Sequence, residues 1–130
     1  MSQPQTNPTA FPNLQGHEFM KLTTFRKAGN AVPTPVWFAQ EGERLFVVTQ
    51  QDAGKVKRIR HTARVTVEPC TARGESLGAM LEARARELPP ELHQTADKAL
   101  NRKYGWMKRM FDLASMLRGN RRTYLEIVPA

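Results

Sequence analysis

The strictest pattern in this 130-residue chain is an alternation of apolar and charged side chains between residues 79 and 86. Every second residue is apolar and most of the intervening ones are charged: Ala79, Leu81, Ala83 and Ala85 against Glu82, Arg84 and Arg86. Successive side chains of a strand point to opposite faces of a sheet, so a period of two indicates a strand with one buried face and one solvated face. Strands of this kind are typical of antiparallel sheets.

Five further segments have the composition of strands. They are bounded by turn formers and span residues 19–25, 31–39, 44–49, 64–69 and 122–128. Six short strands with mostly turn-length connections predict a small antiparallel barrel, because closure removes the unpaired edges that a flat sheet would expose. Pro33 and Pro35 have no N–H to donate, so this part of the second strand is predicted at an edge, at a bulge or facing a ligand.

A helical pattern interrupts the strands before the last one. Pro89 and Pro90 can open a helix, and apolar residues recur at helical spacing from Leu92 to Leu117. Gly105 is expected to divide this region into two helices. The predicted fold class is therefore mainly β (α+β), a six-stranded antiparallel barrel with a helical insertion. Residues 1–16, rich in Gln, Asn, Pro and Thr, are interpreted as a flexible arm, and residues 17–130 as a single domain.

The charge of the chain predicts an anionic partner. Lys and Arg number 20 against 12 Asp and Glu, a formal net charge of +8. Nucleic acid, a membrane surface or a small ligand with phosphates and carboxylates would all be attracted. No apolar run has the length of a membrane span and no signal peptide is recognisable, so a cytoplasmic location is expected.

One basic segment suggests where phosphate binds. The third strand ends at Thr49, a turn follows, and a short helix is predicted over residues 55–60. Free N–H groups at the start of such a helix, with Lys55 beside them, favour an anion through hydrogen bonds and the helix dipole. The glycine spacing of a Walker loop is absent. A solvated basic helix face is the alternative interpretation.

The order and spacing of the motifs resemble a known family. The motifs are Leu22-Thr-Thr-Phe-Arg26, Pro33-Thr-Pro-Val-Trp-Phe38, Leu45 to Thr49, Gly54-Lys55, Arg58-Ile-Arg60 and Arg64-Val-Thr-Val67. Together they are similar to the pyridoxamine 5'-phosphate oxidase-like split-barrel superfamily, and Lys103-Tyr104-Gly105 resembles a segment of its F420-dependent branch. The resemblance implies a six-stranded split barrel that forms a homodimer, with two equivalent cofactor sites at the subunit interface.

The same resemblance implies the residues of the site. Lys55 and Arg60 match the basic positions that hold the cofactor phosphate, and Thr49 matches a strand-end hydroxyl. The strand along the cofactor ring corresponds to Pro35, Val36 and Trp37. Gly54, Lys57 and Arg58 complete the predicted cofactor-binding set, while Tyr104 and Trp106 are predicted to form a substrate lid.

The expected activity is hydride transfer between coenzyme F420 and a small organic substrate. An FMN-dependent oxidoreductase is the alternative, and a non-catalytic flavin, haem or tetrapyrrole carrier is a further one. FMN oxidases of the superfamily usually carry an Arg on the strand that has Thr34 here, and side-chain donors at the turn that is Ala53-Gly54-Lys55 here, which argues against tight binding of the FMN phosphate. Because the cofactor supplies the chemistry, no catalytic side chain is predicted. No metal site, nucleic-acid partner or membrane association is expected.

Overall fold

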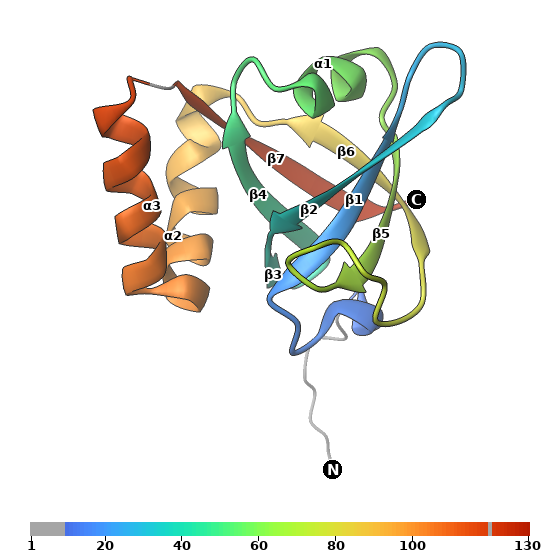
Figure 1. The fold of residues 1–130 in the computed structure, drawn as a ribbon, viewed down its shortest axis with the longest axis horizontal. Helices are drawn as coiled ribbons and strands as arrows, with labels where there is room; N and C mark the ends of the chain where they lie inside the picture. Colours follow the sequence, from blue (N-terminus) through green and yellow to red (C-terminus); the bar gives the residue numbers. More distant parts are fainter. Residues whose placement is uncertain (1–9, 120) are drawn as a thin grey trace.

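The computed structural model describes residues 10–119 and 121–130. In this part of the chain seven strands form one antiparallel sheet (Figure 1): β1 (Phe19–Phe25), β2 (Ala31–Trp37), β3 (Ala39–Glu41), β4 (Arg44–Gln50), β5 (Arg64–Cys70), β6 (Leu81–Glu87) and β7 (Arg122–Pro129). The helices are α1 (Gly54–His61), α2 (His93–Tyr104) and α3 (Trp106–Leu117), with short 3-10 turns η1 (Pro12–Leu14) and η2 (Pro90–Leu92). The predicted split-barrel fold and its helical insertion are confirmed.

The order of the strands explains how the sheet curls into a barrel. Neighbouring strands follow the order β2-β1-β5-β6-β7-β4-β3, so β2 and β3 lie at opposite ends of the sheet. These two strands are consecutive in the chain and only Phe38 separates them. The backbone therefore passes directly from one edge of the sheet to the other and brings the two edges together.

This crossing also corrects the predicted number of strands. The sequence predicts one strand over 31–39, whereas Ala39 pairs with Phe46 of β4 rather than with β1. A single strand cannot pair with both ends of the same sheet without bending, so the segment divides at Phe38. Pro33 and Pro35 lie on β2, which pairs only with β1 among the described strands. Of the three positions predicted for these prolines, the edge of the sheet is therefore confirmed.

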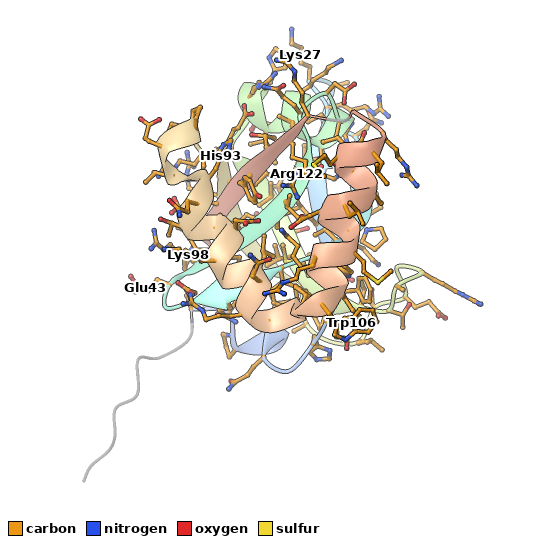
Figure 2. The ribbon with its side chains drawn as sticks, turned by 90° about the vertical axis from the view of Figure 1, so that its left-hand side faces the viewer. Lys27, Glu43, His93, Lys98, Trp106 and Arg122 are labelled. Atoms are coloured by element: carbon orange, nitrogen blue, oxygen red, sulfur yellow. The ribbon has the colours of Figure 1, made fainter. Side chains whose placement is uncertain are left out.

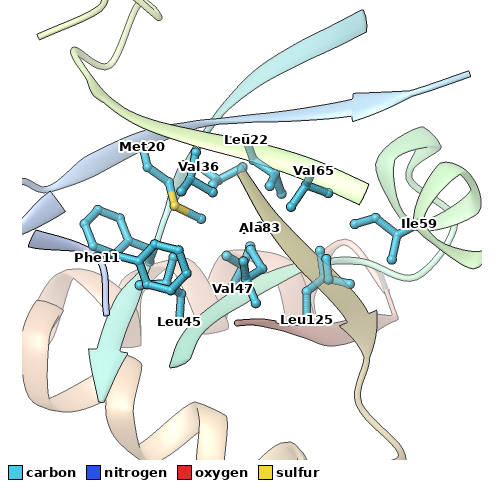
Figure 3. Packing of buried hydrophobic residues seen from close by; sticks show 14 of the residues in the cluster. Phe11, Met20, Leu22, Val36, Leu45, Val47, Ile59, Val65, Ala83 and Leu125 are labelled. Atoms are coloured by element: carbon cyan, nitrogen blue, oxygen red, sulfur yellow. The ribbon is translucent and has the colours of Figure 1, made fainter. Parts of the chain in front are cut away.

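Two apolar layers cover the two faces of the sheet. Inside the barrel, side chains from most strands meet those of α1 and η1 (Figure 3). On the outer face, α2 packs against β3, β4 and β7. β4 lies between the layers, with Leu45 and Val47 in the inner cluster and Phe46 and Val48 in the outer one. Burial on both faces explains why this strand is almost continuously apolar.

The start of the ordered domain also differs from the prediction. Phe11 and Leu14 are each only 1% exposed and belong to the barrel core. The domain therefore begins before the predicted position near His17, because Leu14 of η1 and Phe11, which precedes η1, pack into the barrel core. η1 lies at the lower end of the barrel (Figure 1). The rest of the predicted arm, residues 1–9, lies outside the described residues.

Helices α2 and α3 lie side by side at one flank of the barrel, and α3 is the outermost element there (Figures 1 and 2). Gly105 separates them with a positive φ of 56°, a conformation that favours glycine, and this confirms the predicted break. No described helix is both long and apolar enough to cross a membrane.

Candidate cofactor-binding site

A cavity of about 330 Å³ opens where β2, the end of β4 and the start of α1 meet. Its lining combines five residues predicted for the cofactor site, Pro35, Val36, Trp37, Thr49 and Lys55, with Val48, Gln50, Ala53 and Phe111. The cavity has the size of a small-molecule site and is mostly apolar with a few convergent polar groups, as such sites usually are.

Lys55 is the positive group of this cavity. Its ammonium donates a hydrogen bond of 3.2 Å to Oγ1 of Thr49, which is buried at the end of β4. No carboxylate of the described residues lies within ion-pair distance of Lys55. Burial lowers the pKa of Lys55, and the nearby positive charge of Arg58 lowers it further. A partly buried ammonium with no counter-ion among the described residues would be stabilised in its charged form by an anionic ligand.

The start of α1 adds backbone donors to the same place. The residue before the helix, Ala53, provides no side-chain cap, so the first N–H groups of α1 lack a side-chain acceptor. Arg58 reaches back over this end: a Cβ added to Gly54 would lie 2.8 Å from its Nη1 atom. The Nε of Arg58 donates to Oγ1 of Thr24 at 2.6 Å, which fixes the guanidinium. Arg58 and Gly54 thus lie next to Lys55 at the start of α1, beside the cavity but not among the residues that line it, and their predicted contact with the cofactor stays a prediction.

Aromatic rings form the opposite wall. The Trp37 ring stacks on Tyr104 with centroids 4.6 Å apart and an angle of 14° between the planes. Phe111 of α3 approaches the same Trp37 ring at 5.6 Å and lines the cavity. Phe111 is not among the cofactor-site residues predicted from the sequence. Its place on the apolar spacing of the insertion gave no indication that it would reach β2.

Tyr104 lies beneath Trp37 rather than in a mobile lid. It is 4% exposed, and its hydroxyl accepts the Phe38 N–H at 2.9 Å. The hydroxyl proton lies within reach of the carbonyls of Glu18 at 2.6 Å and Phe38 at 2.8 Å. Tyr104 therefore joins the start of β1 to the crossing between β2 and β3, and burial raises its pKa.

The neighbouring Lys103 supports the same crossing. Its ammonium donates to the carbonyls of His17 at 2.7 Å and Phe38 at 2.9 Å, and lies 3.4 Å from the centroid of the Phe38 ring. Although Lys103 as a residue is exposed, this desolvation of the ammonium lowers its pKa to about 8. The Lys103-Tyr104-Gly105 segment thus holds the barrel closed behind the cavity.

Besides Gly54, Arg58 and Tyr104, three more residues of the predicted site are not among those that line the cavity. Arg60 donates from Nε to Glu87 at 2.9 Å, on the side of α1 that contacts β6. Lys57 is exposed on α1, and Trp106, 69% exposed, marks the start of α3 (Figure 2). Their predicted contacts with cofactor or substrate stay predictions. Among the described residues, no group of three or more His, Cys, Asp or Glu side chains could hold a metal ion.

A second, basic cavity lies at the far end of α1. It has a volume of about 380 Å³ and is lined by Phe25, Arg26, Lys27, Gly29, His61, Thr62 and Arg64. Arg26 is close enough to Arg58 to lower the pKa of that guanidinium further, after desolvation. Arg58 thus lies between the helix start and the basic β1–β2 turn, so positive groups continue from the first cavity towards the second.

Comparison with known proteins identifies relatives of this arrangement. The family model described as pyridoxamine 5'-phosphate oxidase matches residues 8–130. A search of curated proteins found no match to the sequence.

Among solved structures, the haem storage protein HutZ from Vibrio cholerae is 17% identical, with a TM-score of 0.68 over 89% of this chain and 84% of that one. An FAD-binding protein from Mesorhizobium loti is 15% identical, with a TM-score of 0.63 over 90% and 82%. A Clostridium acetobutylicum protein of the pyridoxinephosphate oxidase family, related to general stress protein 26, is 11% identical, with a TM-score of 0.64 over 89% and 78%. At these identities the likeness shows a shared fold.

Proposed function

The chain belongs to the pyridoxamine 5'-phosphate oxidase family, and on this premise we propose that it is an F420-dependent oxidoreductase. The proposed reaction transfers a hydride between the deazaflavin and a small organic substrate, at a site on the interface of a homodimer. When bound, the deazaflavin ring supplies the hydride chemistry. The tasks of this chain are then to bind the phosphate, to orient the ring and to exclude water.

The observation that carries the proposal is the ammonium of Lys55, which has no carboxylate partner among the described residues and lies at the mouth of an aromatic cavity. Lys55 and the uncapped start of α1 would hold a phosphate, because both present donors and positive charge to one point. Trp37 and Phe111 offer flat apolar surfaces at the other end of the cavity, suited to the ring. The residues present therefore fit a phosphorylated, ring-containing cofactor.

The second cavity favours F420 over FMN. Coenzyme F420 continues beyond its phosphate into a polyglutamate tail, whereas FMN ends at the phosphate. Arg26, Lys27 and His61 line the second cavity, on the far side of Arg58 from the phosphate position. A chain of carboxylates could lie along these groups, and the net charge of +8 would attract it over a longer range.

A haem carrier is the candidate of another class, suggested by the similarity to HutZ. Haem iron in proteins is usually held by His, Cys, Met or Tyr. The described residues that line the Lys55 cavity include none of these four types. The cavity therefore suits a flavin or deazaflavin better than an axially ligated haem.

The test is a pair of binding titrations on the purified protein, one with F420 and one with FMN. Tighter binding of F420 supports the proposal, and tighter binding of FMN refutes the choice of cofactor. Lys55→Ala removes a charge-assisted hydrogen bond worth about 1.5–3 kcal/mol, so the Kd should rise about 10- to 150-fold. Lys98→Ala removes the same charge from an exposed position of α2 and serves as the control.

The possible results distinguish binding in the Lys55 cavity from long-range electrostatic attraction of the cofactor. If Lys98→Ala weakens binding as much as Lys55→Ala does, net charge rather than the cavity explains the affinity. If neither cofactor binds and haemin does, with a Soret band that Lys55→Ala leaves unchanged, the carrier function replaces the proposed one. Hydride transfer is checked by the change in deazaflavin absorbance: a loss when the oxidised cofactor is offered with a hydride donor, or a gain when the reduced cofactor is offered with an acceptor substrate.

A further inference from the structure

A third cavity, of about 390 Å³, lies between the loop that follows η1, strand β3 and helix α2. It shares no lining residue with the Lys55 cavity. Its lining combines one lysine, one arginine and one carboxylate with small, amide and apolar residues: Leu14, Gln15, Gly16, Phe38, Ala39, Gln40, Glu41, Ala99, Arg102 and Lys103. The amine of Lys103 has no part in the proposed hydride transfer, so this cavity is open to a separate chemistry.

The Lys103 ammonium uses only two of its three N–H groups within the described residues. Its Nζ donates to the carbonyls of His17 at 2.7 Å and Phe38 at 2.9 Å. The third N–H has no hydrogen-bond acceptor in this part of the chain. Loss of the third proton therefore breaks no hydrogen bond to the protein, and the neutral amine keeps both carbonyl contacts. Its lone pair takes the position of the lost proton, so the side chain is held in place in both protonation states.

The surrounding charges also permit a neutral amine. No carboxylate of the described residues lies within ion-pair distance of Lys103. Glu41, the carboxylate of the cavity, is paired with Arg102. Desolvation lowers the pKa of Lys103 to about 8, although the charge of Glu18 acts in the opposite direction. At pH 8 about half of the Lys103 side chains are therefore neutral, against about 0.4% for a lysine in a peptide.

The guanidinium of Arg102 indicates which electrophile the cavity suits. Arg102 lines the same cavity, and its side chain is exposed. A guanidinium attracts phosphate and can bind it through two parallel hydrogen bonds. An acyl phosphate carries such a phosphate next to its reactive carbonyl, whereas an acyl thioester or an aldehyde has no charge there. The volume lies within the range of small-molecule sites and leaves room for a short acyl chain.

We propose that Lys103 is an acylation site for small acyl phosphates, and that the acyl group weakens the contacts that hold the barrel closed. The neutral Nζ attacks the carbonyl carbon of the acyl phosphate and forms the C–N bond. The C–O bond to phosphate breaks, and phosphate leaves with its electron pair. The nitrogen then loses one proton to solvent, which leaves an amide with a single N–H.

The structural effect follows from this loss of donors and charge. The amide N–H can serve either the His17 or the Phe38 carbonyl, but not both. The positive charge that lies 3.4 Å from the centroid of the Phe38 ring also disappears. Both contacts support the crossing between β2 and β3, so acylation should loosen the closure of the barrel. This proposal requires no bound cofactor and is independent of the proposed function.

The first test treats the full chain, without cofactor, with isotope-labelled acetyl phosphate at pH 8. Peptide mass mapping then measures the acetylation of each lysine. Lys103 should react on the order of tenfold faster than Lys98, an exposed lysine of the same helix. The fraction of neutral amine alone would give about 100-fold over a peptide lysine, but nucleophilicity falls with pKa, as it does for thiols. Equal or slower reaction at Lys103 overturns the proposal.

A pH profile tests whether the neutral amine of Lys103 is the reactive form. The rate at Lys103 should level off above about pH 9, because nearly all of its amines are neutral there. The rate of Nα-acetyl-lysine amide in the same tube should continue to rise to pH 10. Rates that rise in parallel over this range refute the assignment.

The variant Arg102→Gln tests the class of acyl donor. The ratio of the acetyl phosphate rate to the acetic anhydride rate at Lys103 should fall several-fold, because only the first reagent carries a phosphate. Taking the ratio cancels any change in the amine that results from freeing Glu41. An unchanged ratio refutes acyl phosphate as the donor.

Thermal unfolding tests the effect on the barrel. Lys103→Gln, which resembles the acetylated side chain in size and lack of charge, should lower Tm by about 5 °C. Lys98→Gln is the control and should change Tm by less than about 1 °C. If Lys103→Gln does not fold, wild type acetylated at Lys103 to a measured extent gives the same comparison. An unchanged Tm contradicts the structural effect. Acetylation of Lys103 in a protein that binds neither F420 nor FMN would leave this proposal standing and overturn the proposed function.

Discussion

Removing the hydroxyl of Tyr104 tests whether this residue closes the barrel. The variant is Tyr104→Phe, which keeps the ring and its stacking on Trp37. It deletes the acceptor of the buried Phe38 N–H and the donor to the Glu18 carbonyl. The Phe38 carbonyl keeps the ammonium of Lys103 at 2.9 Å, so it stays paired.

The expected loss follows from these contacts. A buried donor without a partner costs about 1–3 kcal/mol, and we take about 2 kcal/mol for the free energy of unfolding. An unfolding entropy of about 2.1 cal/mol/K per residue gives about 270 cal/mol/K for the chain, so Tm should fall by about 7 °C. Tyr124→Phe is the matched control: its hydroxyl donates to Asp97, which keeps Lys108 and Asn101 as donors. Its Tm should fall by about 3–4 °C.

The assay is thermal unfolding followed by circular dichroism, with urea unfolding as an independent measure of the same free energy. A loss for Tyr104→Phe equal to or smaller than that for Tyr124→Phe would refute the reasoning, because the crossing at Phe38 would then not depend on the hydroxyl. A drop in the urea m-value without a change in midpoint would point instead to a change in the unfolded state.

Three further predictions concern the ionisable groups and the start of α1. Burial raises the pKa of Tyr104 and Tyr124, so above pH 10.5 the unfolded chain loses protons that the native state keeps, and the free energy of unfolding should fall as pH rises there. Urea midpoints at pH 10.5–12 measure this, because below that range the lowered pKa of Lys103 has the opposite effect. A flat profile contradicts the prediction. Because the pKa of Lys55 is lowered, Lys55 should react with acetic anhydride near pH 8.5 before the exposed Lys57 of the same helix does. Inorganic phosphate should slow the acetylation of Lys55. Peptide mass mapping measures both effects. Gly54→Ala would displace the Arg58 guanidinium, because the added Cβ would lie too close to it. The affinity for inorganic phosphate should therefore fall several-fold, while Tm changes by less than about 4 °C. An unchanged affinity would show that Arg58 takes no part in phosphate binding.

Much of the fold was predictable because each strand carries its own local signal. The alternation around Ala83 and Ala85 placed these residues inward, and both are buried in the core. What local patterns could not show is the crossing at Phe38. A strand that changes partners looks continuous in sequence, since residues 31–39 remain extended on both sides of the change. Only the pairing of Ala39 with Phe46 reveals the division.

The candidate site shows the same division between local and distant information. Thr49 and Lys55 are six residues apart, and a strand end followed by a helix brings them together, so this pair could be predicted. Phe111 comes from a helix that is about 60 residues further along the chain, and nothing local specifies its contact with Trp37. Arg60 illustrates a different difficulty. A basic residue on a short helix can face a ligand or a carboxylate, and its contact with Glu87 of β6 depends on the packed structure.

Helix α3 exposes several large apolar side chains and buries Lys108, and this arrangement and the aromatic wall of the cavity have one common cause. The charged contacts of Lys108 with Asp97 and Asp112 fix the rotation of α3 about its axis. That rotation directs one flank of the helix, with Phe111, towards Trp37, and leaves apolar side chains such as Trp106 and Leu117 exposed on the outer face. A change in the buried cluster would therefore alter the cavity and the outer face together. Ligand binding beside Trp37 is thus expected to depend on this charged cluster, because the cluster sets the orientation of the helix that carries Phe111.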